Sequence, residues 1–141
     1  MPIERAEKLK VVLDTNVYIS AFTHRQGIAF QVWLLAATSR YKLVASPAII
    51  KETAEVLRRD FYKNDVEVIK IIKLISKVAE IVLPTTELKV ITQDPDDNAI
   101  LECAITGEAH LIISGDHHLL RLKSYQKIGI IRPIDLLRII K

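Results

Sequence analysis

The stretch KVVLDTN, residues 10–16, passes from a short apolar run directly into an acid, a hydroxyl and an amide. An apolar run of this length without polar alternation predicts a strand covered on both faces, as in a parallel sheet. Asp14 follows that strand directly, so we expect it at the carboxyl edge of the sheet, where α/β folds of this kind bind their ligands. The alternative is that Asp14 only caps the next helix.

Four more apolar runs of similar length recur along the chain and alternate with longer helical patterns. This alternation predicts an α/β fold in which helices cover both faces of a mainly parallel, five-stranded sheet. Ser46 and Asp94 each precede a proline and are typical helix caps. The predicted strands are residues 10–13, 41–45, 80–84, 109–114 and 127–133. The predicted helices are residues 28–40, 46–59, 64–79, 95–109 and 133–141.

The composition is that of a globular chain, with 50% hydrophobic and 26% charged residues in a length of 141. This length predicts one domain, residues 1–141. The single cysteine, Cys103, has no partner for an internal disulfide, and the N-terminus is charged where a signal peptide is apolar. No apolar stretch reaches the roughly 18 residues of a membrane span. We therefore expect a soluble, cytoplasmic protein without a membrane partner.

A second acid, Glu52, falls on the apolar face of the helix predicted to begin at Pro47. It lies three residues after Ile49 and four before Val56, and this spacing turns its side chain toward the core. The alternative is a surface glutamate on a slightly rotated helix. The spacing favours a carboxylate that points toward the sheet.

Two further acids, Asp97 and Asp116, fall at the same predicted edge. Asp97 precedes Ile100 and Ala104 at helical spacing and heads a face that covers the sheet, although an acid in a first turn also stabilises the helix dipole. We assign only that dipole role to Asp96. Asp116 follows the strand at 109–114, and a short helix after it leaves a capping role open.

Together the four acids predict a cation site. Carboxylates gathered within several ångströms repel one another, so the protein must either protonate some of them or bind a cation. Ligands that are all oxygen suit Mg²⁺ or Mn²⁺, and the lack of a Cys/His cluster argues against structural zinc. The predicted metal ligands are Asp14, Glu52, Asp97 and Asp116.

The same segments resemble PIN-domain proteins. The resemblance rests on LDTN (13–16), SPAIIKETAEVL (46–57) and DPDDNAILECAITGEAHLIISGD (94–116), and it extends from residue 11 to about residue 132. It implies a three-layer α/β/α sandwich, and it is greatest to bacterial and archaeal PIN proteins regarded as toxin components of toxin–antitoxin pairs.

The resemblance also implies roles for particular residues. The metal-binding acids of the family fall on the four positions chosen above, which become the implied catalytic residues. Polar residues of the family near its first and last acids match Asn16 and Ser114, which we treat as supporting residues. Asn98 joins them as a possible hydrogen-bond donor to the site, with an ordinary place in a helix first turn as the alternative.

The implied chemistry is hydrolysis of RNA phosphodiester bonds by a metal-activated water. Setting aside the four acids leaves 20 basic against 13 acidic residues, a formal charge of about +7 that favours a polyanionic substrate. Near an aromatic turn, Arg58, Arg59 and Lys63 are the predicted substrate-binding residues. The resemblance further implies a homodimer and a small antitoxin protein as partner.

Three other functions remain as alternatives. A PIN-fold module could bind RNA without cleaving it, and a PIN nuclease could process RNA without any antitoxin. A phosphatase or phosphoacceptor with an acid after its first strand is disfavoured. Dehalogenase-like enzymes carry a second aspartate where this chain has Asn16, and receiver domains carry a late lysine where it reads IIRPID.

Overall fold

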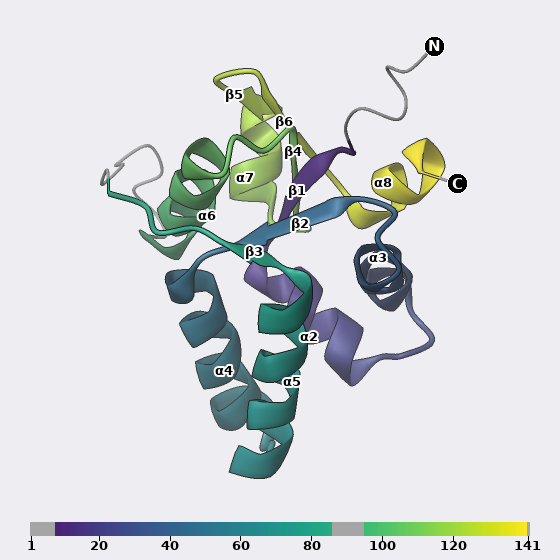
Figure 1. Cartoon of the computed structure of the whole chain (residues 1–141), viewed down its shortest axis with the longest axis vertical. Helices are drawn as coiled ribbons and strands as arrows, with labels where there is room; N and C mark the ends of the chain where they lie inside the picture. Colours follow the sequence, from purple (N-terminus) through teal and green to yellow (C-terminus); the bar gives the residue numbers. More distant parts are fainter. Residues whose placement is uncertain (1–7, 86–94, 141) are drawn as a thin grey trace.

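A computed structural model describes residues 8–85 and 95–140. Within these residues one sheet of six strands has the order β3-β2-β1-β4-β6-β5 (Figure 1). Every pairing is parallel except that between β5 and β6. The strands are β1 (Lys10–Leu13), β2 (Lys42–Ala45), β3 (Glu80–Ile81), β4 (Leu111–Ile113), β5 (Ser124–Tyr125) and β6 (Ile128–Ile131).

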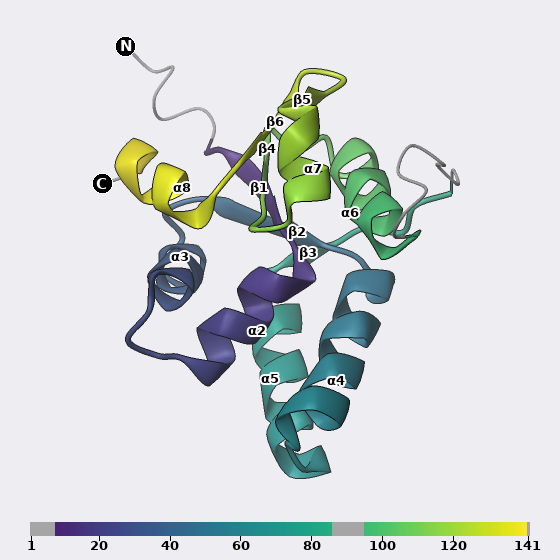
Figure 2. The ribbon, with the colours of Figure 1, turned by 180° about the vertical axis from the view of Figure 1, so that it is seen from behind.

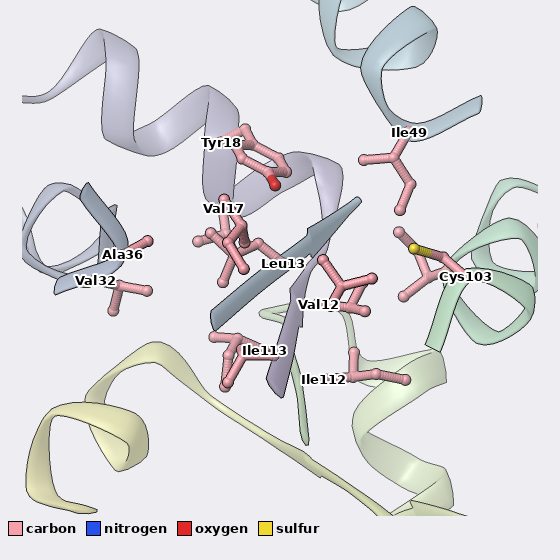
Figure 3. Packing of buried hydrophobic residues seen from close by; sticks show 14 of the residues in the cluster. Val12, Leu13, Val17, Tyr18, Val32, Ala36, Ile49, Cys103, Ile112 and Ile113 are labelled. Atoms are coloured by element: carbon pink, nitrogen blue, oxygen red, sulfur yellow. The ribbon is translucent and has the colours of Figure 1, made fainter. Parts of the chain in front are cut away.

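Helices cover both faces of the sheet, which confirms the predicted three layers. Successive residues of a strand point to opposite faces, so Val12 and Leu13 enter different halves of the core. Figure 3 shows Val12 and Ile112 on the side of Cys103, and Leu13 and Ile113 on the side of Val17. The helices are α2 (Thr15–Thr23), α3 (Ile28–Ala37), α4 (Pro47–Phe61), α5 (Asp65–Val78), α6 (Pro95–Thr106), α7 (His117–Leu122) and α8 (Pro133–Ile139).

The sheet differs from the prediction by its sixth strand. β5 is two residues long and joins β6 through Gln126 and Lys127, which both adopt positive φ angles of 48° and 71°. A strand of two residues is too short to show a hydrophobic pattern, so the sequence does not predict β5. The predicted strand at 80–84 is also shorter and ends at Ile81.

Helix α2 is not among the predicted helices. Its buried residues include Val17, Tyr18 and Phe22 and form a wide face, and only Asn16 and Ser20, one turn apart, are exposed. In a helix of nine residues with so wide a buried face, the 3.6-residue alternation of apolar and polar residues is weak. It packs against α3 and α4 and carries the chain away from the carboxyl end of β1 (Figure 2).

The strand order reverses at β1. The chain passes from β1 to β2 and β3 on one side, and β4 pairs with β1 on the other. In open α/β sheets the crevice at such a reversal, outside the carboxyl ends of the strands, is the usual ligand site. Asp14 and Ser114 directly follow the two strands that flank this point.

No helix in the described part of the chain is long and apolar enough to cross a membrane.

Candidate active site

Asp14 occupies the N-cap position of α2, yet its side chain makes no cap hydrogen bond. Instead Oδ2 accepts a hydrogen bond of 2.7 Å from the Ser114 hydroxyl, which comes from the end of β4. The side chain is buried, with only 4% of the residue exposed. The capping alternative therefore does not describe this carboxylate, which faces the neighbouring strand at the point of reversal.

Ser114 links two of the predicted acids. It is fully buried, donates to Asp14, and its Oγ also accepts the backbone N–H of Asp116 at 2.9 Å. Asp116 itself caps α7, because its Oδ1 accepts the N–H of His118 at 2.6 Å. One hydroxyl thus joins the ends of β1 and β4 and holds the turn that presents Asp116.

Glu52 reaches the same region from α4. The Thr15 hydroxyl donates to its Oε1 at 2.8 Å, across the contact between α2 and α4. The predicted apolar stripe is confirmed by the burial of Ile49, Thr53 and Leu57, and Glu52 beside it is half-buried.

The pKa of the Glu52 carboxyl is raised to about 7. Burial is the main cause, and a hydrogen bond with Asp96 together with the negative charges of Asp96 and Asp14 adds to it. The hydrogen bond from Thr15 acts in the opposite direction. The raised pKa means that these three acids share one electrostatic environment.

The first turn of α6 contributes Asp96, Asp97 and Asn98. Asp97 and Asn98 are buried, at 4% and 7% exposure, where α6 packs against β1 and β4. Asp96 is exposed and shares its hydrogen bond with Glu52, so a helix-dipole role alone does not describe it. Neighbouring positions in a first turn differ by about 100° in direction, and spacing alone could not decide which acid meets α4.

The predicted acids do not form a complete cluster of metal ligands in the described part of the chain. Among residues 8–85 and 95–140, no three His, Cys, Asp or Glu side chains lie close enough together to hold a metal ion. The contacts join them in smaller groups: Glu52 with Asp96, and Asp14 with Asp116 through Ser114. The donor atoms are carboxylate and hydroxyl oxygens, which fit Mg²⁺ or Mn²⁺. The pKa of Glu52, raised mainly by burial and further by Asp96 and Asp14, indicates a site in which a cation would stabilise the ionised carboxylate. The four-ligand assignment stays a prediction.

A pocket of about 320 Å³ opens beside Glu52, and its lining includes Lys51, Arg59 and Asp96. The predicted substrate-binding cations are each paired with an acid: Arg59 with Asp60 at 3.0 Å, Arg58 with Asp65 at 3.1 Å, and Lys63 with Glu67 at 3.6 Å. Of the three, Arg59 is the one that lines the Glu52 pocket. The supporting residue Asn16 is exposed on the first turn of α2.

Comparison with known proteins decides the family. The PIN domain family model matches residues 10–118, which include both strands at the reversal and all four predicted acids. The chain belongs to the PIN-domain family. Membership of this family supports the nuclease class of the predicted activity.

A relative of this PIN domain is identified by sequence. The chain is 34% identical over 124 residues to the uncharacterized protein MJ1680 of Methanocaldococcus jannaschii, a match that covers 85% of this chain and 79% of that protein.

Two solved structures share the fold. VapBC2 from Rickettsia felis, bound to a DNA fragment from its promoter, matches with a TM-score of 0.62 and 13% identity over 88% of this chain and 98% of that chain. VapBC-1 from nontypeable Haemophilus influenzae matches with a TM-score of 0.61 and 17% identity over 89% and 99%.

Proposed function

We propose that this PIN domain is a metal-dependent endoribonuclease. The observation that carries the proposal is Asp14, a buried carboxylate at the sheet reversal that binds Ser114 and leaves its own helix uncapped. Burying a carboxylate is costly unless it is paired, hydrogen-bonded or bound to a metal ion. Asp14 also lies in the crevice where sheets of this kind usually bind their ligands. Glu52, with its raised pKa, adds a second acid to the same environment.

In this proposal Asp14, Glu52, Asp97 and Asp116 hold one or two Mg²⁺ or Mn²⁺ ions. A bound ion of this kind polarises a phosphoryl oxygen and lowers the pKa of water. Ser114 orients Asp14 through its hydroxyl and, by accepting the Asp116 N–H, holds the turn that carries the last acid. Asn16 and Asn98 stand close by in sequence as further hydrogen-bonding residues.

The substrate we propose is RNA, contacted by Arg58, Arg59 and Lys63. The basic excess of the chain supports a polyanion, and Arg59 beside Glu52 offers a guanidinium for a phosphate near the acids. Because each of these cations already pairs with an acid, binding would exchange a surface ion pair for a phosphate contact, a small cost for exposed pairs.

The test is cleavage of labelled, unstructured RNA by the purified chain with Mg²⁺ or Mn²⁺, beside matched single-stranded DNA. We expect RNA fragments that disappear with EDTA and with Asp14→Asn. Cleavage that persists in both controls would exclude the proposed site. Equal cleavage of the DNA would exclude RNA as the specific substrate.

We propose further that the chain acts as a toxin beside a small antitoxin protein. Two solved structures that share its fold, at 13% and 17% identity, are VapBC toxin–antitoxin complexes, which supports this role. Induced expression should arrest growth, and co-expression of an antitoxin encoded by a small open reading frame next to the gene should restore it. Arrest by the Asp14→Asn variant to the same degree would contradict a catalytic toxin.

A second candidate is an RNA-binding PIN module without catalysis. One observation favours it: the described residues hold no group of three metal-binding side chains. This candidate predicts that RNA binding is the same with Mn²⁺ and with EDTA, and that Asp14→Asn binds RNA at least as well as the parent chain. Measured Mn²⁺ binding that Asp14→Asn abolishes would exclude it.

A further inference from the structure

We propose that Thr15 is a positioning residue that holds the Glu52 carboxylate in place for cation binding. The inference rests on the proposed metal-dependent function and adds a residue outside the predicted site. Thr15 directly follows Asp14, so one turn of chain delivers an acid and the hydroxyl that orients another. The donor and acceptor lie 37 residues apart in sequence and 2.8 Å apart in the structure.

The direction of the Thr15 hydroxyl is unusual for a threonine in a helix. Helical threonines commonly donate to the carbonyl one turn earlier. Thr23, Thr38 and Thr53 follow this habit, with hydroxyl bonds of 2.6, 2.7 and 2.8 Å to the carbonyls of the residues four positions before them.

Thr15 cannot follow this habit, because it is the first residue of α2 and the residue four positions earlier belongs to β1. Its hydroxyl is therefore available for α4 and donates to Glu52 Oε1. Only 4% of Thr15 is exposed, so water does not compete for the bond from the Thr15 side.

Glu52 needs such a donor. A glutamate side chain has several rotatable bonds and loses much rotamer freedom when it is held in one place. The negative charges of Asp14 and Asp96 also disfavour an ionised Glu52 pointing inward. A hydroxyl that donates to Oε1 compensates both effects.

The test compares Thr15→Val, Thr15→Ala and Thr15→Ser with Thr53→Val as a matched control. Thr53 is adjacent to Glu52, is fully buried, and donates only to its own helix at Ile49. Binding of Mn²⁺ by the purified full chain is measured from the electron paramagnetic resonance signal of the free ion. Thermal unfolding is followed for every variant, and RNA cleavage gives kcat and KM.

We expect Thr15→Val and Thr15→Ala to weaken Mn²⁺ binding about 10- to 100-fold, as is typical for loss of a partner that orients a metal ligand. Thr15→Ser should recover most of the affinity because it keeps the hydroxyl. Thr53→Val should lose stability but bind Mn²⁺ like the parent chain. Cleavage by the Thr15 variants should fall in kcat at fixed Mn²⁺, with KM for RNA little changed.

Three outcomes would overturn the proposal. The first is Mn²⁺ binding of parental strength by Thr15→Val or Thr15→Ala. The second is an equal loss in Thr53→Val, which would reduce Thr15 to a structural residue. The third is a parent chain that binds no Mn²⁺, which removes the proposed metal dependence as well; the first two leave that function standing. If Thr15→Val does not fold, the comparison of Thr15→Ala with Thr15→Ser decides.

Discussion

Asp14 and Asp116 occupy similar places in the chain, since each stands at the N-cap position of a helix that follows a buried parallel strand, Asp14 directly after β1 and Asp116 three residues after β4. Their strands, β1 and β4, are neighbours. Yet Asp116 is half-buried and caps its helix, whereas Asp14 is buried and bonds to Ser114 instead. An aspartate at the N-cap position therefore caps its helix in one case and makes no cap hydrogen bond in the other.

The two aspartates therefore differ in what their carboxylates contribute to folding stability. Replacing the carboxylate of Asp116 should cost the stability of a helix cap, because its oxygen satisfies a backbone donor of α7. Replacing the carboxylate of Asp14 should cost little stability, because no helix donor depends on it. A buried charge with no capping role is expected to be retained for function at the expense of stability.

The largest expected effect is that of Asp14→Asn on RNA cleavage. Metal-ion catalysis supplies several kcal/mol, and each 1.4 kcal/mol is tenfold in rate, so cleavage should fall about 1,000-fold. The amide can still accept the Ser114 hydroxyl, so the free energy of unfolding should change by less than about 1 kcal/mol. Rate measurements and urea unfolding check the two parts. Normal cleavage by Asp14→Asn, or a loss of cleavage that is explained by unfolding of the variant, would contradict a functional role for Asp14 that is separate from stability.

The next effect concerns Ser114→Ala, which removes the hydroxyl between the two aspartates. Cleavage and Mn²⁺ affinity should fall about 10- to 100-fold, because Asp14 loses the donor that orients it. Ser114→Thr would keep the hydroxyl but add a methyl group at a fully buried site. The second variant is therefore Ser114→Cys, whose side chain has nearly the same volume as that of serine. Full affinity in Ser114→Ala would show that the link between β1 and β4 does not orient Asp14.

A smaller effect is expected in the pH dependence of stability. The Glu52 pKa is about 7 in the folded chain and 4.5 without the fold, so the folded state binds more protons between these values. The contribution of Glu52 to stability should therefore be greatest below about pH 4.5 and should fall as pH rises toward 7. The fall attributable to Glu52 should be about 1–2 kcal/mol, since solvent screens a carboxyl that is only half-buried.

Unfolding measured from pH 4 to pH 8 checks this fall against Glu52→Gln, which should lack it. Adding Mn²⁺ should flatten the curve of the parent chain, because a cation competes with the proton. Glu55→Gln is the matched control, since Glu55 is an exposed glutamate three residues after Glu52 in α4. Identical pH curves for the parent chain and Glu52→Gln would contradict the crowding of acids at this edge.

The smallest effect is the loss of the α7 cap. Asp116→Ala should lower the free energy of unfolding by about 1 kcal/mol, whereas Asp116→Asn, which keeps an acceptor for the His118 N–H, should lower it much less. Both variants should lose Mn²⁺ affinity if Asp116 is also a ligand. If Asp116→Asn binds Mn²⁺ as tightly as the parent chain, Asp116 is a helix cap and not a metal ligand, unlike Asp14.

Much of the fold follows from local sequence. The apolar runs at 10–13, 41–45 and 109–114 predict parallel strands that the structure confirms within a few residues, and Ser46 caps α4 as expected. The prediction missed α2, because its wide buried face weakens the helical alternation, and it missed β5, which is too short for a pattern.

The site was only partly predictable. Spacing along α4 correctly turned Glu52 toward the core, because a helix repeats at short range. It could not reveal the roles of Thr15 and Asp96, since each depends on how α2, α4 and α6 pack against one another.

Hydrophobic pattern and helix caps were sufficient for the α/β layers and for placing Asp14 and Asp116 after neighbouring parallel strands. Tertiary packing alone decided which hydroxyl meets which carboxylate, because the bonds from Ser114 to Asp14 and from Thr15 to Glu52 join residues 100 and 37 positions apart. Patterns of three or four residues describe one element at a time, and such bonds exist only where two elements meet.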